Sequence, residues 1–209
     1  MTTLFLDRGY RGACFDLGEQ NRLVLRKNLA HYGDQVTVVD SLDSINGAKF
    51  DYLLAFEVLE HIQQDEDALR RWTNFLQKDG RILISVPAHM RKFGKDDEYV
   101  GHVRRYEKQE LIELLKGAGY SNILVLSYGY PLGNLTRLAE RILHHEPSHP
   151  PHLTSEQKSM MSGIQRSPLL NKLSFLFNET TLQPFNLLQR LFYNTDLGDG
   201  YIAYAKLKK

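Results

Sequence analysis

The sequence predicts an α/β fold built on a doubly wound, mostly parallel sheet. The segment "KFDYLLAF" (49–56) is almost continuously apolar, which is typical of a strand buried on both faces of such a sheet. Strand-like and helix-like segments alternate through residue 129. Asp16, Asp40 and Glu57 each come at the carboxyl end of a predicted strand. Because doubly wound sheets bind ligands at these ends, the three acids predict a binding site along one edge.

The elements follow in order along the chain. Predicted helices end at glycines such as Gly9 and Gly33, because glycine readily adopts the conformation that closes a helix. The helix that begins at Asp65 has an acidic first turn, which suits the positive end of the helix dipole. The predicted strands cover 12–16, 35–40, 49–56, 81–87 and 121–129, and the predicted helices cover 3–8, 19–33, 65–80 and 108–120.

Beyond residue 130 the alternation stops. The pattern predicts an amphipathic helix over 131–145, a polar proline-rich loop over 146–157 and a helical stretch over 168–192. The alternating segment "GYIAYAKLK" (200–208) predicts a last strand. Because a strand returns after the helices, we predict an insertion and not a separate domain. The predicted division is a core of residues 1–130 and 198–209 with a helical insertion or lid over 131–197.

Composition and charge restrict the function. The 209 residues are 42% hydrophobic, enough to bury one substantial core. The net charge is +1, whereas a surface that follows nucleic-acid phosphates needs a clear excess of Lys and Arg, so we expect no nucleic-acid partner. The single cysteine, Cys14, excludes a disulfide within the chain and fits a reducing compartment. With no bilayer-length apolar run and no signal-peptide pattern, we predict a cytoplasmic protein.

Five segments carry a family resemblance when they are taken in sequence. They are "GYRGACFDLG", "VTVVDSLDSI", "FDYLLAFEVLEHI", "LQKDGRILISVP" and "GHVRRYEKQELIELLKGAGY". Together they resemble the class I S-adenosylmethionine-dependent methyltransferases, and above all the group that includes the ubiquinone-biosynthesis O-methyltransferases. The resemblance covers residues 3–130 and the last strand. It implies a Rossmann-like sheet with an antiparallel last strand, S-adenosylmethionine as the cofactor and a small-molecule substrate.

The resemblance assigns the cofactor to residues that follow the first three predicted strands. Asp16 matches the acid that binds the ribose hydroxyls, and a carboxylate at a strand end can accept two hydrogen bonds from a vicinal diol. Leu17 is expected against the adenine face. Asp40, with Ser41 after it, matches the acid that binds the adenine amino group, and Phe56 matches a shelf beside the sulfonium. The alternative for both acids is a helix cap or turn carboxylate.

The stretch "FEVLEHI" and a later histidine carry the predicted chemistry. Offsets of three and four bring Glu57, Glu60 and His61 together if a helical turn begins at the strand end. In some relatives, among them small-RNA 2′-O-methyltransferases, a matching E-x-x-E-H binds a divalent metal with a further histidine, a role that His102 would fill. These donors suit Mn²⁺, Fe²⁺ or Zn²⁺ better than Mg²⁺, although metal is not the favoured interpretation. Without metal, the alternative is that Glu57 faces the substrate pocket, Glu60 helps to cap the helix and His61 makes an ordinary polar contact. His61 or His102 is then the candidate general base.

The motif "GHVRRY" predicts the substrate contacts. Arg104 and Arg105 precede a helix and are expected to clamp an anionic group of the substrate, with Tyr106 beside them. The alternative is that one arginine pairs with an acid of the pocket while Tyr106 packs under the helix.

The region beyond residue 130 carries two weaker signals. Four histidines between 144 and 152 alternate with prolines and have no regular spacing, so we interpret them as part of a solvated loop and not as a metal site. Residues 169–192 are rich in Leu and Phe. They are compatible with a lid over an apolar pocket, with peripheral membrane contact, or with a cover packed on the sheet, which is the favoured interpretation. The oligomeric state is left open.

One part of the family pattern is missing. The Gly-rich turn D-x-G-x-G-x-G, which lets the backbone approach the methionine part of the cofactor, is not found, nor is the strand before it. We therefore expect an N-terminally truncated sheet, explained by a fragment or mis-set start, by a remnant of the fold, or by a partner that supplies the strand. Because two inner edges would be left unpaired, we expect this polypeptide to be unstable or to bind S-adenosylmethionine poorly.

The sequence as a whole predicts methyl transfer from S-adenosylmethionine to an O, N or C nucleophile of a small molecule. The alternative is a non-catalytic remnant or fragment of a methyltransferase that does not bind the cofactor on its own.

Overall fold

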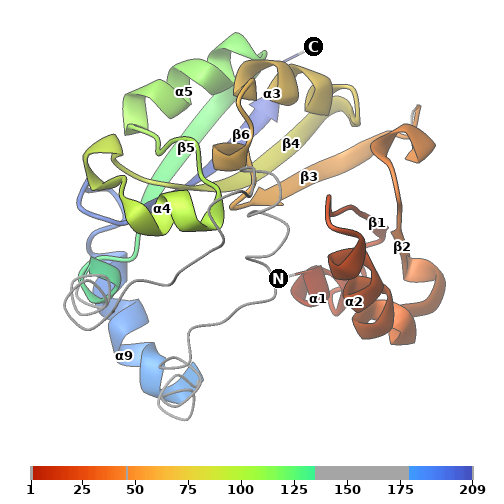
Figure 1. Cartoon of the computed structure of the whole chain (residues 1–209), viewed down its shortest axis with the longest axis horizontal. Helices are drawn as coiled ribbons and strands as arrows, with labels where there is room; N and C mark the ends of the chain where they lie inside the picture. Colours follow the sequence, from red (N-terminus) through yellow and green to blue (C-terminus); the bar gives the residue numbers. More distant parts are fainter. Residues whose placement is uncertain (1, 46, 135–178, 209) are drawn as a thin grey trace.

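The computed structural model describes residues 2–45, 47–134 and 179–208, and its largest unit is a four-stranded sheet (Figure 1). In spatial order the strands of this main sheet are β3 (Phe50–Phe56), β4 (Leu76–Pro87), β6 (Gly200–Leu207) and β5 (Tyr120–Tyr128). β3 and β4 are parallel, whereas β6 is antiparallel to both of its neighbours. The predicted antiparallel last strand is therefore confirmed.

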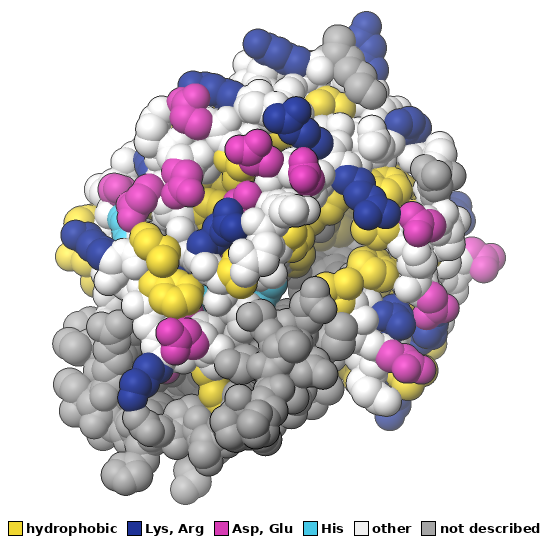
Figure 2. Space-filling model, turned by 45° about the horizontal axis from the view of Figure 1, so that its top comes forward, with side chains coloured by type: hydrophobic (Ala, Val, Ile, Leu, Met, Phe, Trp, Pro, Cys, Tyr) yellow, Lys and Arg dark blue, Asp and Glu magenta, His cyan; other side chains and the backbone are white. Residues whose placement is uncertain are grey.

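A second, smaller sheet lies beside β3. It consists of β1 (Gly12–Cys14) and β2 (Val36–Val38), which are parallel. Among the described residues no strand lies between β1 and β3, so the sheet is divided into two parts, as expected for an absent inner strand. Tyr10 and Tyr52 touch across the division, with ring centroids 5.9 Å apart. Figure 2 shows a hollow with hydrophobic side chains along its walls between the two parts.

The hydrophobic core is centred on β4 and β6, because these strands have neighbours on both sides. Ile82 and Ile84 of β4 are fully buried, as are Tyr201 and Ala203 of β6. Their spacing of two residues places each pair on one face of its strand. The main sheet thus gives the carboxyl ends of β3 and β4 a rigid support.

Two helices cover the same side of the main sheet, α3 (Asp65–Thr73) and α5 (Lys108–Gly117) (Figure 1). Leu111 and Leu115, one helical turn apart on α5, are fully buried, and so is Leu69 of α3. The apolar stripes of both helices therefore complete the core.

The predicted helix over 65–80 is wrong beyond Thr73. Residues from Leu76 onward belong to β4, where Leu76 pairs with Phe50 of β3. The predicted helix over 19–33 is divided as well, into an α-helix and a shorter 3₁₀ segment. The remaining helices of the first part of the chain are α1 (Thr2–Leu6), α2 (Glu19–Leu29) and α4 (Lys95–Val100), with 3₁₀ segments η1 (Ala30–Gln35), η2 (Leu42–Ile45), η3 (Leu59–His61) and η4 (Met90–Lys92).

The described part of the region before β6 contains α9 (Glu179–Arg190), which falls inside the helical stretch predicted over 168–192. Most of the predicted helix over 131–145, the loop over 146–157 and residues 168–178 lie outside the described residues. In the parts of the chain that are described, no helix combines the length and hydropathy needed to cross a bilayer. The division into a core and an insertion over 131–197 stays a prediction.

Candidate functional site

The predicted acids lie at the carboxyl ends of their strands. Asp16 and Asp40 each follow the last residue of β1 and β2 by two positions, and Glu57 directly follows β3. β1 pairs with β2 in parallel, so Asp16 and Asp40 lie at the same edge of the smaller sheet.

Arg22 of α2 links the loops that follow β1 and β2. Its Nε lies 3.2 Å from Oδ1 of Asp40, and its Nη1 donates to the backbone oxygens of Asp16 and Leu17 at 2.7 and 2.8 Å. Arg26, one turn further along α2, donates to the same Oδ1 at 2.7 Å. The hydrogen bond from Arg26, with that from Arg22, lowers the pKa of the Asp40 carboxyl, which therefore stays ionised at neutral pH.

Both carboxylates retain one oxygen for a ligand. Oδ1 of Asp16 accepts hydrogen bonds from the backbone N of Gly18 at 2.8 Å and from Nδ2 of Asn21 at 3.0 Å. This oxygen therefore has the turn role that the sequence analysis gave as the alternative for Asp16. Within the described residues, Oδ2 of Asp16 and Oδ2 of Asp40 make no hydrogen bond or ion pair. Leu17, directly after Asp16, is 58% exposed. Two free acceptors beside an exposed apolar side chain fit the adenosine part of S-adenosylmethionine.

The other two predicted cofactor residues, Ser41 and Phe56, differ in how well their positions suit a cofactor contact. Oγ of Ser41 accepts from the backbone N of Asp43 at 3.1 Å, which is a turn role. Phe56 is the last residue of β3 and half-buried, next to Glu57. Phe56 thus keeps a position suited to the predicted shelf.

Glu57 has a strained backbone conformation, and its carboxylate is held by two residues that the sequence analysis did not select, Ser85 and Tyr128. Its φ is +52°, uncommon for a residue other than glycine and concentrated at functional sites. Oε1 of Glu57 accepts from Oγ of Ser85 at 2.6 Å and from the hydroxyl of Tyr128 at 2.9 Å. Burial and the neighbouring Glu57 charge raise the pKa of Tyr128, so its hydroxyl remains a donor. The only sequence signal was Ser85, a polar residue inside the apolar strand "RILISVP".

A second cluster, here called the Glu60 group, consists of Glu60, His61 and His102. The Glu60 side chain is fully buried, and neither of its carboxylate oxygens has a hydrogen-bond partner. Oε1 lies 3.6 Å from Nε2 of His102 and 3.9 Å from Nε2 of His61, and the two ring centroids are 4.7 Å apart. The structure therefore brings these three predicted residues together.

Both imidazoles direct Nε2 toward Glu60 because Nδ1 is bound elsewhere. Nδ1 of His61 lies 3.2 Å from the backbone oxygen of Gly101, and Nδ1 of His102 lies 2.9 Å from Oδ1 of Asp97. Each of these oxygens accepts a hydrogen bond, so the ring hydrogen belongs on Nδ1 and the lone pair on Nε2. Asp97 is a functional candidate that the sequence analysis missed, since α4 was not predicted.

Burial sets the charges of this group. Burial, with the nearby Glu57 charge, raises the pKa of Glu60 to about 9, which favours the neutral acid. Burial also lowers the pKa of His61, with His102 adding to the effect. Asp97 behaves differently: burial acts to raise its pKa, but hydrogen bonds from His102 and Arg105 outweigh it and lower the pKa to about 2.

The Glu60 group also fits a divalent metal. One ligand atom from each of its three residues lies within 4.8 Å of the others. Two imidazoles and one carboxylate are a common donor set for Zn²⁺ or Fe²⁺, and the Nδ1 contacts are those that orient metal-bound histidines. Glu57 is not a member of this set, because Ser85 and Tyr128 hold its carboxylate. Without a metal, the Nε2 lone pairs are available to accept a proton.

The predicted substrate contacts of Arg105 and Tyr106 are wrong, because both side chains are buried. Arg105 is 3% exposed and bonds Oδ1 of Asp97 through Nε and Nη2, both at 2.8 Å. Tyr106 is fully buried and donates to Asp65 at 2.9 Å. Arg104 also pairs with Asp65, at 2.8 Å. The motif therefore follows its alternative interpretation, in which an arginine pairs with an acid and Tyr106 packs in the core.

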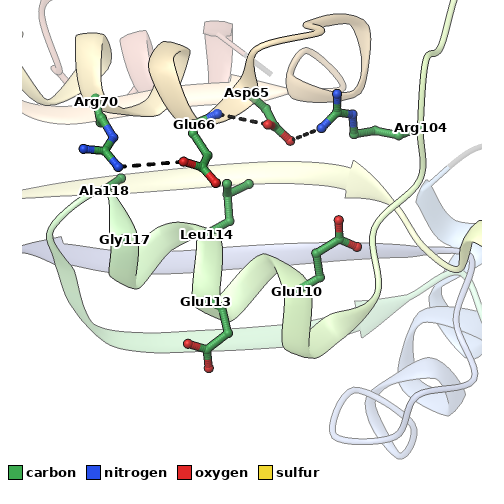
Figure 3. Close-up of a pocket in the computed structure, with 9 residues that line it drawn as sticks. All are labelled: Asp65, Glu66, Arg70, Arg104, Glu110, Glu113, Leu114, Gly117 and Ala118. Carbon is green, nitrogen blue, oxygen red and sulfur yellow. Dashed lines mark hydrogen bonds and ion pairs between the residues drawn. The ribbon is translucent and has the colours of Figure 1, made fainter.

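Arg104 lines a cavity of about 310 Å³ between α3 and α5 (Figure 3). Around it lie acidic side chains such as Glu110 and Glu113 on α5 and Glu66 on α3, with Arg70 paired to Glu66. None of the other predicted site residues lines this cavity. The cavity is separate from the sheet edge where Asp16 and Asp40 lie.

Comparison with known families fits this arrangement. The profile of the methyltransferase domain family matches residues 1–125, more than half of the chain. The chain therefore belongs to this family, and the predicted class I S-adenosylmethionine-dependent methyltransferase is confirmed. No curated protein matches the sequence.

Solved structures show the same fold at low identity. A protein from Galdieria sulphuraria, provisionally named a sarcosine dimethylglycine methyltransferase, is 14% identical, with a TM-score of 0.59 over 99% of this chain and 74% of the other. The 1,6-didemethyltoxoflavin-N1-methyltransferase of Burkholderia thailandensis, solved with S-adenosylhomocysteine, is 18% identical, with a TM-score of 0.54 over 100% of this chain and 66% of the other. Phosphoethanolamine N-methyltransferase 2 of Haemonchus contortus is 20% identical, with a TM-score of 0.54 over 96% of this chain and 44% of the other. The Rossmann-like class is confirmed.

Proposed function

We propose that the chain transfers a methyl group from S-adenosylmethionine to an O, N or C nucleophile of a small molecule in the cytoplasm. The observation that carries the proposal is the edge where Arg22 joins the ends of β1 and β2 and leaves Oδ2 of Asp16 and of Asp40 as acceptors. These oxygens suit the ribose and the adenine amino group. Glu57, at the end of β3, then borders the reacting end of the cofactor.

The reaction asks the protein to align the acceptor with the sulfonium, exclude water and remove a proton. His102 is the general base that we favour. Its Nδ1 hydrogen is bound by Asp97, which fixes the ring and stabilises the imidazolium that forms after Nε2 takes a proton. Glu57 orients the acceptor, because Ser85 and Tyr128 fix only one of its carboxylate oxygens.

Cofactor binding tests the proposed edge directly. Saturation-transfer NMR with S-adenosylmethionine detects weak binding and suits the whole chain. Asp16→Asn and Asp40→Asn should each weaken binding about tenfold, the scale of a lost charge-assisted hydrogen bond. Asp34→Asn, an exposed acid just before β2, is the matched control and should bind like the wild type. Binding by Asp16→Asn and Asp40→Asn equal to that of the wild type would overturn the roles given to these two acids. A wild type that does not bind the cofactor would favour the non-catalytic alternative.

A metal-assisted reaction is a second candidate, favoured by the convergence of Glu60, His61 and His102. A bound Zn²⁺ or Fe²⁺ would supply Lewis-acid chemistry, while Asp97 and Gly101 would orient the two imidazoles. Activity that survives exhaustive chelation would exclude this candidate. Activity that is lost on chelation and restored by one metal would replace the general-base interpretation.

Peripheral membrane contact through 169–192 stays a prediction that α9 supports. Phe185, Leu187 and Leu188 on α9 are exposed, and Leu191 beyond it is 75% exposed. Sedimentation with liposomes tests the contact: Leu187→Ser and Leu191→Ser together should reduce the bound fraction. A wild-type chain that stays in the supernatant would remove the idea.

A further inference from the structure

His89, Glu107 and Asp196 meet beside the carboxyl end of β4 and share no residue with the Glu60 group. His89 follows β4 by two positions, Glu107 is the N-cap residue of α5, and Asp196 lies in the loop before β6. One nitrogen or carboxylate oxygen of each lies within 4.8 Å of the others. Segments distant in the sequence thus bring one imidazole and two carboxylates together.

The imidazole of His89 is buried and lacks a partner at one nitrogen. Its side chain is 4% exposed, yet Nε2 makes no hydrogen bond. Nδ1 lies 3.2 Å from Oε2 of Glu107, an acceptor, so the ring hydrogen belongs on Nδ1 and Nε2 presents its lone pair. Oδ1 of Asp196 lies 3.8 Å from Nε2. An unpartnered buried polar atom is rare in proteins, and a bound ion is one of its ordinary explanations.

The spacing of these two atoms suits a cation between them. A separation of 3.8 Å is too long for a hydrogen bond, but ligands bound to one zinc ion at about 2.0–2.2 Å lie roughly 3–4 Å apart. The Tyr201 hydroxyl donates to Oδ1 of Asp196 and restrains that carboxylate. The side chains of Glu107 and Asp196 are 50% and 54% exposed, so an ion can enter from solvent.

We propose that Nε2 of His89 and the carboxylate of Asp196 bind a divalent cation of the zinc type, with water completing the coordination. Mg²⁺ and Ca²⁺ prefer oxygen ligands throughout, whereas an imidazole with a carboxylate suits Zn²⁺. Glu107 is a positioning residue, because it holds Nδ1 and so aims Nε2. The ion would join the end of β4 to the loop before β6.

Calorimetric titration of the whole chain with ZnCl₂ tests the site. His89→Asn and Asp196→Asn should each remove one bound ion or weaken its binding at least tenfold. Asn adopts positive φ more readily than most residues, so His89→Asn suits the φ of +65° at this position. Glu107→Gln should weaken binding about tenfold, as is usual for residues that orient a metal-bound histidine. His31→Asn, at an exposed histidine, is the matched control and should change nothing.

His61→Asn separates this site from the Glu60 group, because it should leave zinc binding at His89 intact. Thermal unfolding gives a second measurement: Zn²⁺ should raise the Tm of the wild type and of His61→Asn but not that of His89→Asn. Zinc binding of unchanged stoichiometry and affinity in both His89→Asn and Asp196→Asn would overturn the proposal. A wild-type chain that binds no zinc would overturn it as well.

Discussion

At the scale of single residues, the site depends on polar groups whose hydrogen-bond partners come from other elements. His102 owes its orientation to Asp97 of α4, and Asp97 is also bound by Arg105. Glu57 owes its position to Ser85 on β4 and Tyr128 on β5. Side chains fixed in this way lose little entropy when a ligand binds, which is the usual condition for catalysis by positioning.

His102→Gln should lower the rate of methyl transfer by about 10²–10⁴-fold, the contribution of a positioned general base. The affinity for S-adenosylmethionine should change little, because His102 is not among the residues that we assign to the cofactor. Transfer of a labelled methyl group to an acceptor measures the rate, with His31→Gln as the control. An unchanged rate in His102→Gln would remove this residue from the mechanism.

Asp97→Asn should destabilise the protein by about 3 kcal/mol, because it removes the nearer of the two carboxylates that pair with the buried Arg105 and leaves only Asp199, at 3.7 Å. The side chains of Asp97 and Arg105 are both 2% exposed. Asp96→Asn on the same helix is the matched control; Asp96 is exposed, and its replacement should change stability by no more than about 0.5 kcal/mol. Urea unfolding measures both variants, and equal midpoints would contradict the role given to the ion pair.

At the scale of elements, the loop before β6 passes so close to β5 that the position of Gly198 has no room for a side chain. A Cβ on Gly198 would collide with Oγ of Ser127 and with the backbone of Tyr128. The backbone N of Gly198 also donates to Oγ of Ser127 at 2.9 Å. There is therefore no room for a side chain where this loop passes Tyr128, the residue that holds Glu57.

Gly198→Ala should destabilise the protein by about 1–3 kcal/mol, the usual cost of overpacking. Gly117→Ala is the matched control, since a Cβ there meets nothing within 4 Å and α5 gains a better helix former. Its stability should be equal to that of the wild type or higher. Thermal unfolding compares the two variants, and a Tm of Gly198→Ala at or above that of Gly117→Ala would show that the loop can move aside.

The elements themselves were largely predictable from local pattern. The apolar strand at 49–56 and the alternating strand at 200–208 were found within one residue of their bounds. The predicted helix over 65–80 failed because "NFLQKDG" has no local signal for a strand. Leu76 enters β4 through pairing with Phe50, a long-range contact that periodicity does not reveal.

The candidate site was predictable only in part, for a related reason. The position of Asp16, Asp40 and Glu57 at strand ends follows from the α/β pattern. The offsets in "EVLEH" predicted a cluster of Glu57, Glu60 and His61, but the cluster in the structure contains Glu60, His61 and His102. Asp97 and Tyr128 could not be identified, because their roles depend on tertiary packing. Arg105 was misassigned for the same reason, since a charged residue is expected at the surface unless its buried partner is known.

At the scale of the whole molecule, the division between the two sheets is the main feature. Within the described residues, β1 pairs only with β2 and β3 only with β4, so each has an inner edge without a neighbouring strand. Unpaired edges expose backbone hydrogen-bond donors and acceptors, and they make the unfolding of the two sheets less cooperative. The cofactor edge is divided as well, since Asp16 and Asp40 belong to one sheet and Glu57 to the other.

The polypeptide alone should therefore bind S-adenosylmethionine weakly, with a dissociation constant above the micromolar range, and should unfold at low denaturant concentration. Calorimetry with S-adenosylhomocysteine and urea unfolding measure the two properties. Micromolar affinity together with a single cooperative transition at high urea would show that the two sheets act as one unit despite the division.

The open side of β3 has a consequence for the exchange of its amide hydrogens with deuterated solvent. Successive N–H groups of a strand point to opposite sides, so those directed at β4 are sheltered by hydrogen bonds, and the alternate ones have no such shelter from any described residue. Deuterium uptake along this strand should consequently alternate between slow and fast from one residue to the next.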